Sequence, residues 1–188
     1  MYLTDKIELI NRLLTCDGCT CCDAGTVYVL SREVDFLRSQ GVEVLETFGY
    51  HFIPQGANGC LYNDPIKKKC TIYEHRPICC RLFPFDIYLS DFSQDLYWVY
   101  YKKCKKIVEV LGESQNLRGV LEIINEVERH ISLEDILEFY KMNIVTRRIE
   151  RGENIKANYQ IVKPLRCKID KIMRRKSFER VYCCPSRT

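Results

Sequence analysis

The spacing of apolar and polar positions along the chain predicts an alternation of short helices and strands. Four elements are predicted in the first part of the chain, namely a helix, a strand, a helix and a strand, at residues 4–14, 26–30, 31–40 and 42–48. The second helix is predicted to bury Val34, Phe36 and Leu37 and to end at Gly41. Residues 49–59 contain three glycines and a proline, and this composition predicts a loop.

Aromatic and β-branched residues predict two further strands, at 85–89 and 96–101. The polar residues between them indicate a β-hairpin with a long loop. Farther along, apolar residues recur at helical spacing from Leu117 to Ile131. This pattern predicts an amphipathic helix.

Ser132 and Asp135 provide an N-cap and an acidic first turn for a next helix, predicted over residues 133–143. This helix and the one before it are expected to form an antiparallel pair. Residues 147–163 are mostly polar and are predicted to be a linker. Pro164 is then predicted to begin a last helix that runs to about residue 182.

Together these elements predict an α+β fold in two parts. Residues 1–110 are predicted to form a small cysteine-rich metal-binding domain with a β-hairpin, and residues 111–188 a helical C-terminal extension. No apolar run reaches the roughly 20 residues that a membrane span needs, and the polar start of the chain does not resemble a signal peptide. The protein is therefore expected in the cytoplasm, without membrane association.

The chain contains twelve cysteines, eight of which lie in two segments. The first segment is CDGCTCC, which starts at Cys16, and the second runs from Cys60 to Pro84. In a reducing cytoplasm, clustered cysteines more often bind metal than form disulfides. A CxxC pair such as Cys16 and Cys19 brings two sulfurs together at a turn, which supplies half of a tetrahedral thiolate site. The other half must come from elsewhere along the chain.

The central cysteine segment resembles a known family, the cysteine-cluster proteins that carry a zinc- or iron-chelating domain. Residues 70–83, CTIYEHRPICCRLF, match the family pattern CxIYExRPxxCRxF at every position. Cys60 and Cys104 stand where that family has its flanking cysteines. There are two departures. The first knot is CxxCxCC where the family has CxxCxxCC, and Cys79 is an additional thiol.

The resemblance implies metal binding and no settled catalytic reaction, so no catalytic residue is predicted. The shorter knot leaves open whether Cys21 or Cys22 takes the third ligand role. Cys79 and Cys167 are expected not to bind the metal. The candidate metal ligands are all cysteines, and they are Cys16, Cys19, Cys21, Cys22, Cys60, Cys70, Cys80 and Cys104.

An all-sulfur ligand set suits either zinc or an iron–sulfur cluster. A four-iron (4Fe-4S) cluster is favoured, with zinc as the alternative, because the cysteines are vicinal and the three histidines lack the spacing of a zinc finger. A site with four thiolates carries a net charge of about −2. Arg76 and Arg81 are therefore candidates for hydrogen bonding near the thiolates, with surface ion pairing as the alternative. The lysines at 67–69 are interpreted as a solvated loop.

Three functions are compatible with this pattern. The first is a metal-binding protein for cluster handling, metal handling or electron transfer. The second is an enzyme in which the cluster supports redox or protein-modifying methyl-transfer chemistry. The third is a metal-stabilised module that binds nucleic acid. Against the enzyme hypothesis, the sequence contains no GxGxxG or GxxxxGKS/T nucleotide loop and no convincing Ser/His/Asp set. Whether the protein is an enzyme is left open.

The charge of the chain is unevenly distributed. From Arg147 to the end there are thirteen basic and four acidic residues, whereas the preceding part has sixteen basic and twenty-one acidic residues. A basic helix of this kind is more often a solvated face or a docking surface than a nucleic-acid site. We therefore expect a protein partner on the basic C-terminal helix, and nucleic acid is the less favoured partner.

Overall fold

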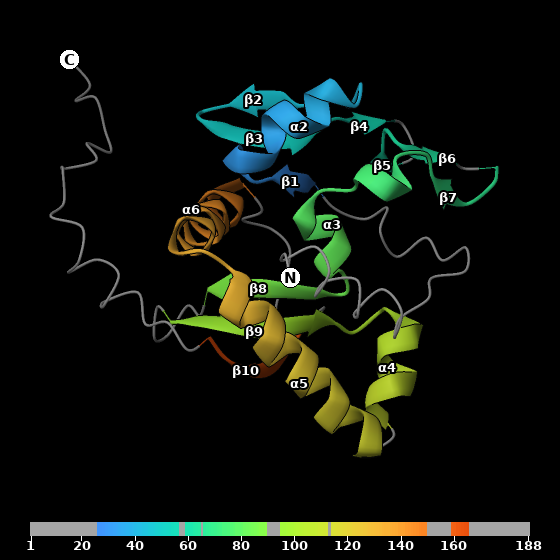
Figure 1. Ribbon diagram of the computed structural model, residues 1–188, viewed down its shortest axis with the longest axis vertical. Coiled ribbons are helices and arrows are strands. Elements are labelled where there is room, and N and C mark those ends of the chain that lie inside the picture. The colour runs from blue at the N-terminus through green and yellow to red at the C-terminus, as the bar shows by residue number, and fades with distance from the viewer. Residues whose placement is uncertain are drawn as a thin grey trace, which may run out of the picture.

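The computed structural model describes residues 26–56, 59–64, 66–89, 95–112, 114–149 and 159–165. Within these ranges it contains helices and several small antiparallel sheets, so the α+β class is supported. Figure 1 shows the short strands that precede β8 gathered above, and the sheet of β8 to β10 with helices α4 and α5 below. The predicted helix at 4–14, and any helix beyond residue 165, lie outside the described residues. No helix in these ranges is long and apolar enough to cross a membrane.

The first sheet has the strand order β1-β3-β2, and both of its strand pairs are antiparallel. A short 3-10 helix, η2, leads into α2 beside it. The apolar core of this part consists of Val29, Val34, Leu37, Val42, Val44 and Ile53. Its elements are β1 (Val27–Val29), η2 (Ser31–Glu33), α2 (Val34–Ser39), β2 (Leu45–Thr47) and β3 (Tyr50–Ile53).

Three predictions need correction in this part. The helix over 31–40 is confirmed, but its first turn is 3-10 and Phe36 is 51% exposed rather than buried. The strand over 42–48 is shorter than predicted. The loop over 49–59 was wrong. Phe48 and Gly49, at φ values of 54° and 75°, make a tight turn between β2 and β3, so the glycine marks a turn between paired strands.

The cysteine-bearing segment folds into two-residue strands and two short helical turns. β4 pairs with β5, and β6 pairs with β7, each antiparallel. The helix α3 begins directly after Pro77, which occupies its N-cap position. The elements are β4 (Gln55–Gly56), β5 (Gly59–Cys60), β6 (Asn63–Asp64), β7 (Lys69–Cys70), η3 (Tyr73–His75) and α3 (Ile78–Leu82).

The second three-stranded sheet has the order β10-β9-β8. Both predicted strands are present and pair antiparallel from Phe85↔Tyr100 to Leu89↔Leu96, while the loop between them lies outside the described residues. The linker predicted over 147–163 was wrong at its end, because Tyr159–Pro164 forms β10 along β9, and Pro164 ends a strand where we expected it to begin a helix. The elements here are β8 (Phe85–Leu89), β9 (Leu96–Tyr101), α4 (Lys105–Gly112), α5 (Ser114–His130), α6 (Leu133–Ile149) and β10 (Tyr159–Pro164).

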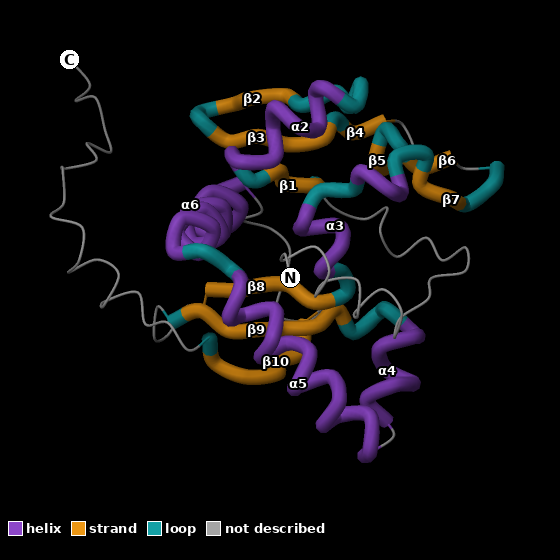
Figure 2. The backbone as a smooth tube through the Cα atoms, viewed as in Figure 1, coloured by secondary structure: helices purple, strands orange, loops and turns teal. Residues whose placement is uncertain are grey.

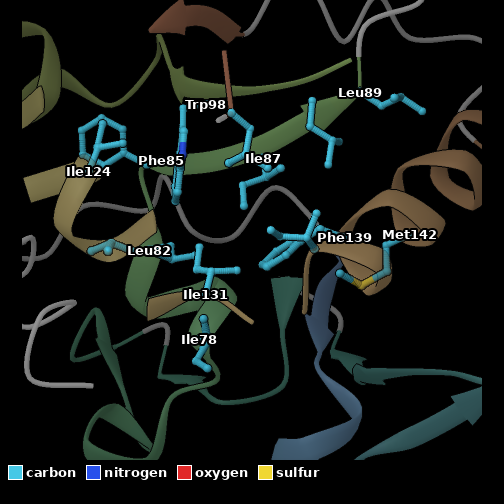
Figure 3. Close-up of a cluster of buried hydrophobic side chains, with 14 of the residues drawn as sticks. Ile78, Leu82, Phe85, Ile87, Leu89, Trp98, Ile124, Ile131, Phe139 and Met142 are labelled. Atoms are coloured by element: carbon cyan, nitrogen blue, oxygen red, sulfur yellow. The ribbon is translucent and has the colours of Figure 1, made fainter. Parts of the chain in front are cut away.

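The main apolar core lies between this sheet, α3 and the helices α4, α5 and α6. Trp98 is fully buried at its centre, with Ile87 on β8 and Ile124 on α5 around it (Figure 3). The core joins residues from both sides of position 110, where we placed a domain boundary. That boundary remains a prediction, although α5 shares its core with β8 and β9.

Polar contacts fix the helices against this sheet. The Lys163 ammonium on β10 donates to Asn125 Oδ1 at 2.6 Å and forms an ion pair with the buried Glu128 of α5. The Asn143 side chain of α6 exchanges two hydrogen bonds with the backbone of β8, at Leu89 N and Ile87 O. That exchange satisfies the edge of the sheet, since an edge strand otherwise leaves backbone groups unpaired.

The start of α6 is capped as predicted, but the two helices are not an antiparallel pair. Ser132 and Asp135 form a reciprocal capping box, with bonds of 3.0 and 3.1 Å between each side chain and the other's backbone N–H. Figure 2 shows α6 end-on while α5 runs across the view. The helices therefore cross. The Asp135 carboxylate also forms an ion pair with Arg32, with 2.9 Å between Oδ1 and Nε. This ion pair holds α6 against η2.

Candidate metal centre

Five of the twelve cysteines lie in the described residues, and all five are thiols. Cys60 is on β5 and Cys70 is on β7, while Cys79 and Cys80 are on α3. Cys104 lies between β9 and α4. The other predicted ligands, Cys16, Cys19, Cys21 and Cys22, lie outside the described residues.

The structure brings Cys60 and Cys70 together. The chain turns at β6 and β7, and Thr71 donates from its backbone N–H to Tyr62 O at 2.8 Å, which returns Cys70 towards β5. Both thiols are half-buried. Burial raises the pKa of the Cys70 thiol and the neighbouring Cys60 raises it further, whereas a hydrogen bond from Ile72 N–H and the charge of Arg76 lower it. Two thiols that interact electrostatically in this way are close enough to bind one metal ion. Metal binding would displace the protons of both thiols.

Helix α3 is positioned by Glu33, a residue that the sequence analysis did not single out. The Glu33 carboxylate accepts a hydrogen bond from Ile78 N–H at 2.8 Å and a longer one, 3.4 Å, from Leu30 N–H. Burial raises the pKa of Glu33 to about 7, in spite of these hydrogen bonds and of Arg32 and Arg81. Glu33 thus fixes the first turn of the helix that carries Cys80.

Cys79 and Cys80 have different surroundings although they are adjacent. Cys79 packs against the main core, and its pKa lies well above the usual range because it is buried and because Glu33 and Asp86 are near. Successive residues on a helix point about 100° apart, so Cys80 faces a different direction. This arrangement agrees with the expectation that Cys80 and not Cys79 is a ligand, and that expectation remains a prediction.

The two arginines of the motif brace the turn that separates β7 from α3. Arg81 donates to the carbonyl oxygens of Arg76 at 2.7 Å and Glu74 at 3.1 Å. The Arg76 guanidinium lies 3.6 Å from the centroid of the Tyr73 ring and donates to the Tyr73 carbonyl at 3.0 Å. These contacts set the path from Cys70 to Cys80. Arg76 is also close enough to Cys70 for its charge to lower the thiol pKa.

Cys104 lies apart from this turn, as far as its described contacts show. Its side chain is buried in the main core, its N–H donates to Tyr101 O at 3.1 Å, and its carbonyl accepts from Val108 at 3.3 Å within the start of α4. A buried thiol at this point can serve packing as well as ligation.

Within the described ranges, no three His, Cys, Asp or Glu side chains are placed so that they could hold a metal ion. The ligand set predicted from the sequence is therefore not tested as a whole. The histidines have contacts elsewhere: His51 lies 3.6 Å from Glu46, His75 contacts the Phe36 ring, and His130 Nδ1 lies 2.8 Å from Glu126 O. The donors in the cysteine segment are thus sulfur atoms, which suit zinc or iron–sulfur chemistry.

A small cavity of about 90 Å³ lies between the first sheet and α6. Ser31, His51, Glu138 and Lys141 contribute its polar groups. Ligand sites for small molecules usually enclose several hundred cubic ångströms, so the cavity is too small to hold such a substrate. It also contains no cysteine, and it is therefore separate from the Cys60/Cys70 pair.

Comparison with known proteins identifies the cysteine-bearing part. An uncharacterized protein of Methanocaldococcus jannaschii is 33% identical over 75 residues, which are 36% of this chain, and the chain spans 41% of the length of that curated relative. No solved structure matches the chain significantly. Residues 15–106, which include all five described cysteines, match the family model CxxCxxCC, described as "Putative zinc- or iron-chelating domain". The cysteine-bearing part of this chain is therefore similar, over residues 15–106, to the CxxCxxCC family of chelating domains.

Proposed function

We propose that the protein binds a metal centre through cysteine thiolates, and that this centre is an iron–sulfur cluster used in cluster handling, metal handling or electron transfer. The observation that carries the proposal is the pair of half-buried thiols, Cys60 and Cys70, brought from separate strands into one electrostatic environment. The family assignment supports metal binding in general.

The donor set fits such a centre in part. Cys60 and Cys70 would supply two thiolates. Cys80 lies on the helix that Glu33 and Arg81 contact, but in the described ranges it forms no group of three metal donors with them, and its ligation remains a prediction. The remaining ligands would come from Cys16, Cys19, Cys21, Cys22 and Cys104. When bound, an iron–sulfur cluster supplies one-electron redox chemistry, and zinc would supply structural stability alone.

The cationic groups near the thiols support the binding of an anionic centre. Arg76 lowers the pKa of Cys70 by its charge, so it favours the thiolate over the thiol. Arg81 lies on α3 directly after Cys80. The described histidines contact other groups, which favours a centre held by sulfur alone. Such a centre suits zinc or an iron–sulfur cluster, and the vicinal cysteines are the reason that the cluster is proposed first.

The absorbance spectrum of protein purified without oxygen tests the nature of the centre. We expect a brown protein with broad absorbance near 400 nm that bleaches with dithionite, and with iron and acid-labile sulfide in equal amounts. A colourless protein with stoichiometric zinc would show that the centre is zinc and would rule out electron transfer. Protein without bound metal of either kind would refute the proposal.

The alternative functions have less support. The enzyme hypothesis requires a substrate cleft, and the cavity beside α6 is small and lacks cysteine. The nucleic-acid hypothesis and the protein partner on the basic C-terminal helix both depend on residues beyond 165, outside the described ranges. A titration with nucleic acid at two salt concentrations tests the former, because phosphate contacts weaken with salt.

A further inference from the structure

The turn between β6 and β7 exposes an apolar side chain among cations. Ile66 is 90% exposed, and Lys67, Lys68 and Lys69 follow it with exposed side chains. Figure 1 shows β6 and β7 at the periphery of the molecule, away from α5 and α6. We call residues Ile66–Lys69 the basic tip.

The basic tip is held in one shape. The Asp64 side chain accepts hydrogen bonds from the backbone N–H groups of Ile66 and Lys67, both at 2.9 Å from the same oxygen, and its other oxygen lies 4.0 Å from the Lys67 ammonium. Lys68 adopts a left-handed backbone conformation, with φ at 51°. A turn that is already ordered loses little conformational entropy when a partner binds it.

We propose that the basic tip docks a protein partner whose surface offers an apolar pocket surrounded by aspartate and glutamate side chains. Three lysines beside one another give the tip a local positive charge that steers an acidic surface towards it. A single protruding isoleucine requires a matching concave surface, because only a pocket removes most of its area from water.

Other occupants fit the basic tip less well. A membrane surface is usually recognised by four to eight basic residues together with larger apolar or lipid anchors, and the tip has three lysines and one isoleucine. Single-stranded nucleic acid requires aromatic rings for base stacking. The rings nearest along the chain are Tyr62, whose hydroxyl accepts a hydrogen bond from Glu43 N–H, and Tyr73, which Arg76 already covers.

The position of the basic tip suggests what the partner does. Lys69 and Cys70 are consecutive on β7, so a partner on the tip lies beside the Cys60/Cys70 thiols. A metal donor or acceptor would be placed there for exchange. This role rests on the proposed function, whereas docking itself does not.

The chain provides a matched control for the isoleucine. Phe48, in the turn between β2 and β3, is 94% exposed and is likewise an apolar side chain at the end of two paired strands. Its neighbourhood contains Glu46 instead of lysines. Removal of Phe48 therefore changes exposed apolar area without changing the basic tip.

The experiment follows the backbone amide signals of Ile66–Lys69 by NMR while the full-length protein is titrated with a random copolymer of glutamate and tyrosine. We expect these signals to shift, with an apparent Kd that weakens about tenfold in Ile66→Ser and in the double variant Lys68→Gln/Lys69→Gln, which keeps the ion pair of Lys67 with Asp64. Phe48→Ser is expected to leave the apparent Kd unchanged. All variants should retain the thermal midpoint of the wild type, because the altered side chains are exposed.

The proposal is overturned if the tip signals do not respond, if the tip variants bind the copolymer as the wild type does, or if phosphatidylserine vesicles or oligouridine shift the same signals at lower concentration. Metal analysis of the same preparations separates the outcomes. Loss of tip binding with metal retained contradicts the docking proposal alone, and absence of metal with tip binding retained contradicts the proposed function alone.

Discussion

The segment from Gln55 to Cys80 and the sheet of β8, β9 and β10 are stabilised in different ways. The sheet and its helices enclose an apolar core that includes the fully buried Trp98, Ile107, Ile124 and Val127. The cysteine segment contains strands of two residues. Cys60, Tyr62 and Ile72 are partly buried against the small first core, and Ile78 and Cys79 at its end pack in the main core. Sheets this short are not stable on their own.

Local polar contacts partly compensate for this shortage. Arg81 and Arg76 fix the turn before α3, Asp64 fixes the turn before β7, and Glu33 fixes the start of α3. Each such contact contributes only about 1 kcal/mol net. One half of the molecule is therefore stabilised mainly by apolar burial, and the proposed metal centre would stabilise the other.

The largest effect is expected from metal removal. Structural zinc contributes roughly 10–16 kcal/mol of apparent binding free energy in small metal domains, because ligation and folding are one process there. A chelator should therefore abolish the hydrogen-exchange protection of β5, β7 and α3, while β8 and β9 remain protected. Equal loss of hydrogen-exchange protection in the cysteine segment and in the sheet would contradict the idea that the two regions are stabilised in different ways.

Trp98→Ala should produce the next largest effect. Removal of a fully buried tryptophan leaves a cavity and costs about 3–5 kcal/mol of unfolding free energy, measurable by urea denaturation. Metal content at low urea should be unchanged. Trp98→Phe is the matched control. The indole N–H of Trp98 has no hydrogen-bond partner among the described residues, so this variant leaves no partner unsatisfied.

Arg81→Ala should have an intermediate effect that is confined to the cysteine segment. It leaves the carbonyl groups of Glu74 and Arg76 without their charged donor, which costs about 1–3 kcal/mol. The metal should be lost at lower chelator concentration than in the wild type, while the urea midpoint of the sheet stays the same. Arg118→Ala, which removes an exposed pair with Glu122 on α5, is the control and should change neither value.

The last prediction concerns the pH dependence of stability. The pKa of Glu33 is about 7 in the folded protein and 4.5 in the unfolded chain. Between pH 4.5 and pH 7 the folded protein therefore keeps a proton on Glu33 that the unfolded chain releases. This group therefore lowers stability as pH rises from 4.5 to 7. Glu33→Gln should flatten that part of the stability profile relative to the wild type. A difference between the two proteins that does not vary over this range would contradict the raised pKa.

The regular elements of the larger half could be predicted from periodicity. Strands β8 and β9 and helices α5 and α6 have clear apolar patterns, and the capping box at Ser132 and Asp135 is visible in the sequence. Strand β10 was missed because its pairing with β9 depends on residues 58 to 67 positions away. The crossing of α5 and α6 was missed because a short connection alone does not determine the angle between helices.

The candidate site was predictable in type and less so in detail. Residue spacing and the motif selected Cys60, Cys70 and Cys80 as candidate ligands, and their ligation remains a prediction. Glu33 could not be found, because its partner Ile78 is 45 residues away and neither residue belongs to a ligand pattern. Phe36 was wrongly predicted to be buried because it is apolar, although helical spacing places it off the face that Val34 and Leu37 share. Its ring contacts His75 at the surface.

Metal content of cysteine variants tests the central claim most directly. Cys70→Ser removes one member of the thiol pair, and Cys79→Ser removes a core thiol of the same chemistry. Elemental analysis of both variants, purified anaerobically beside the wild type, should find metal lost from Cys70→Ser and retained in Cys79→Ser. Full metal content in Cys70→Ser would contradict the assignment of the Cys60/Cys70 pair as the core of the metal site.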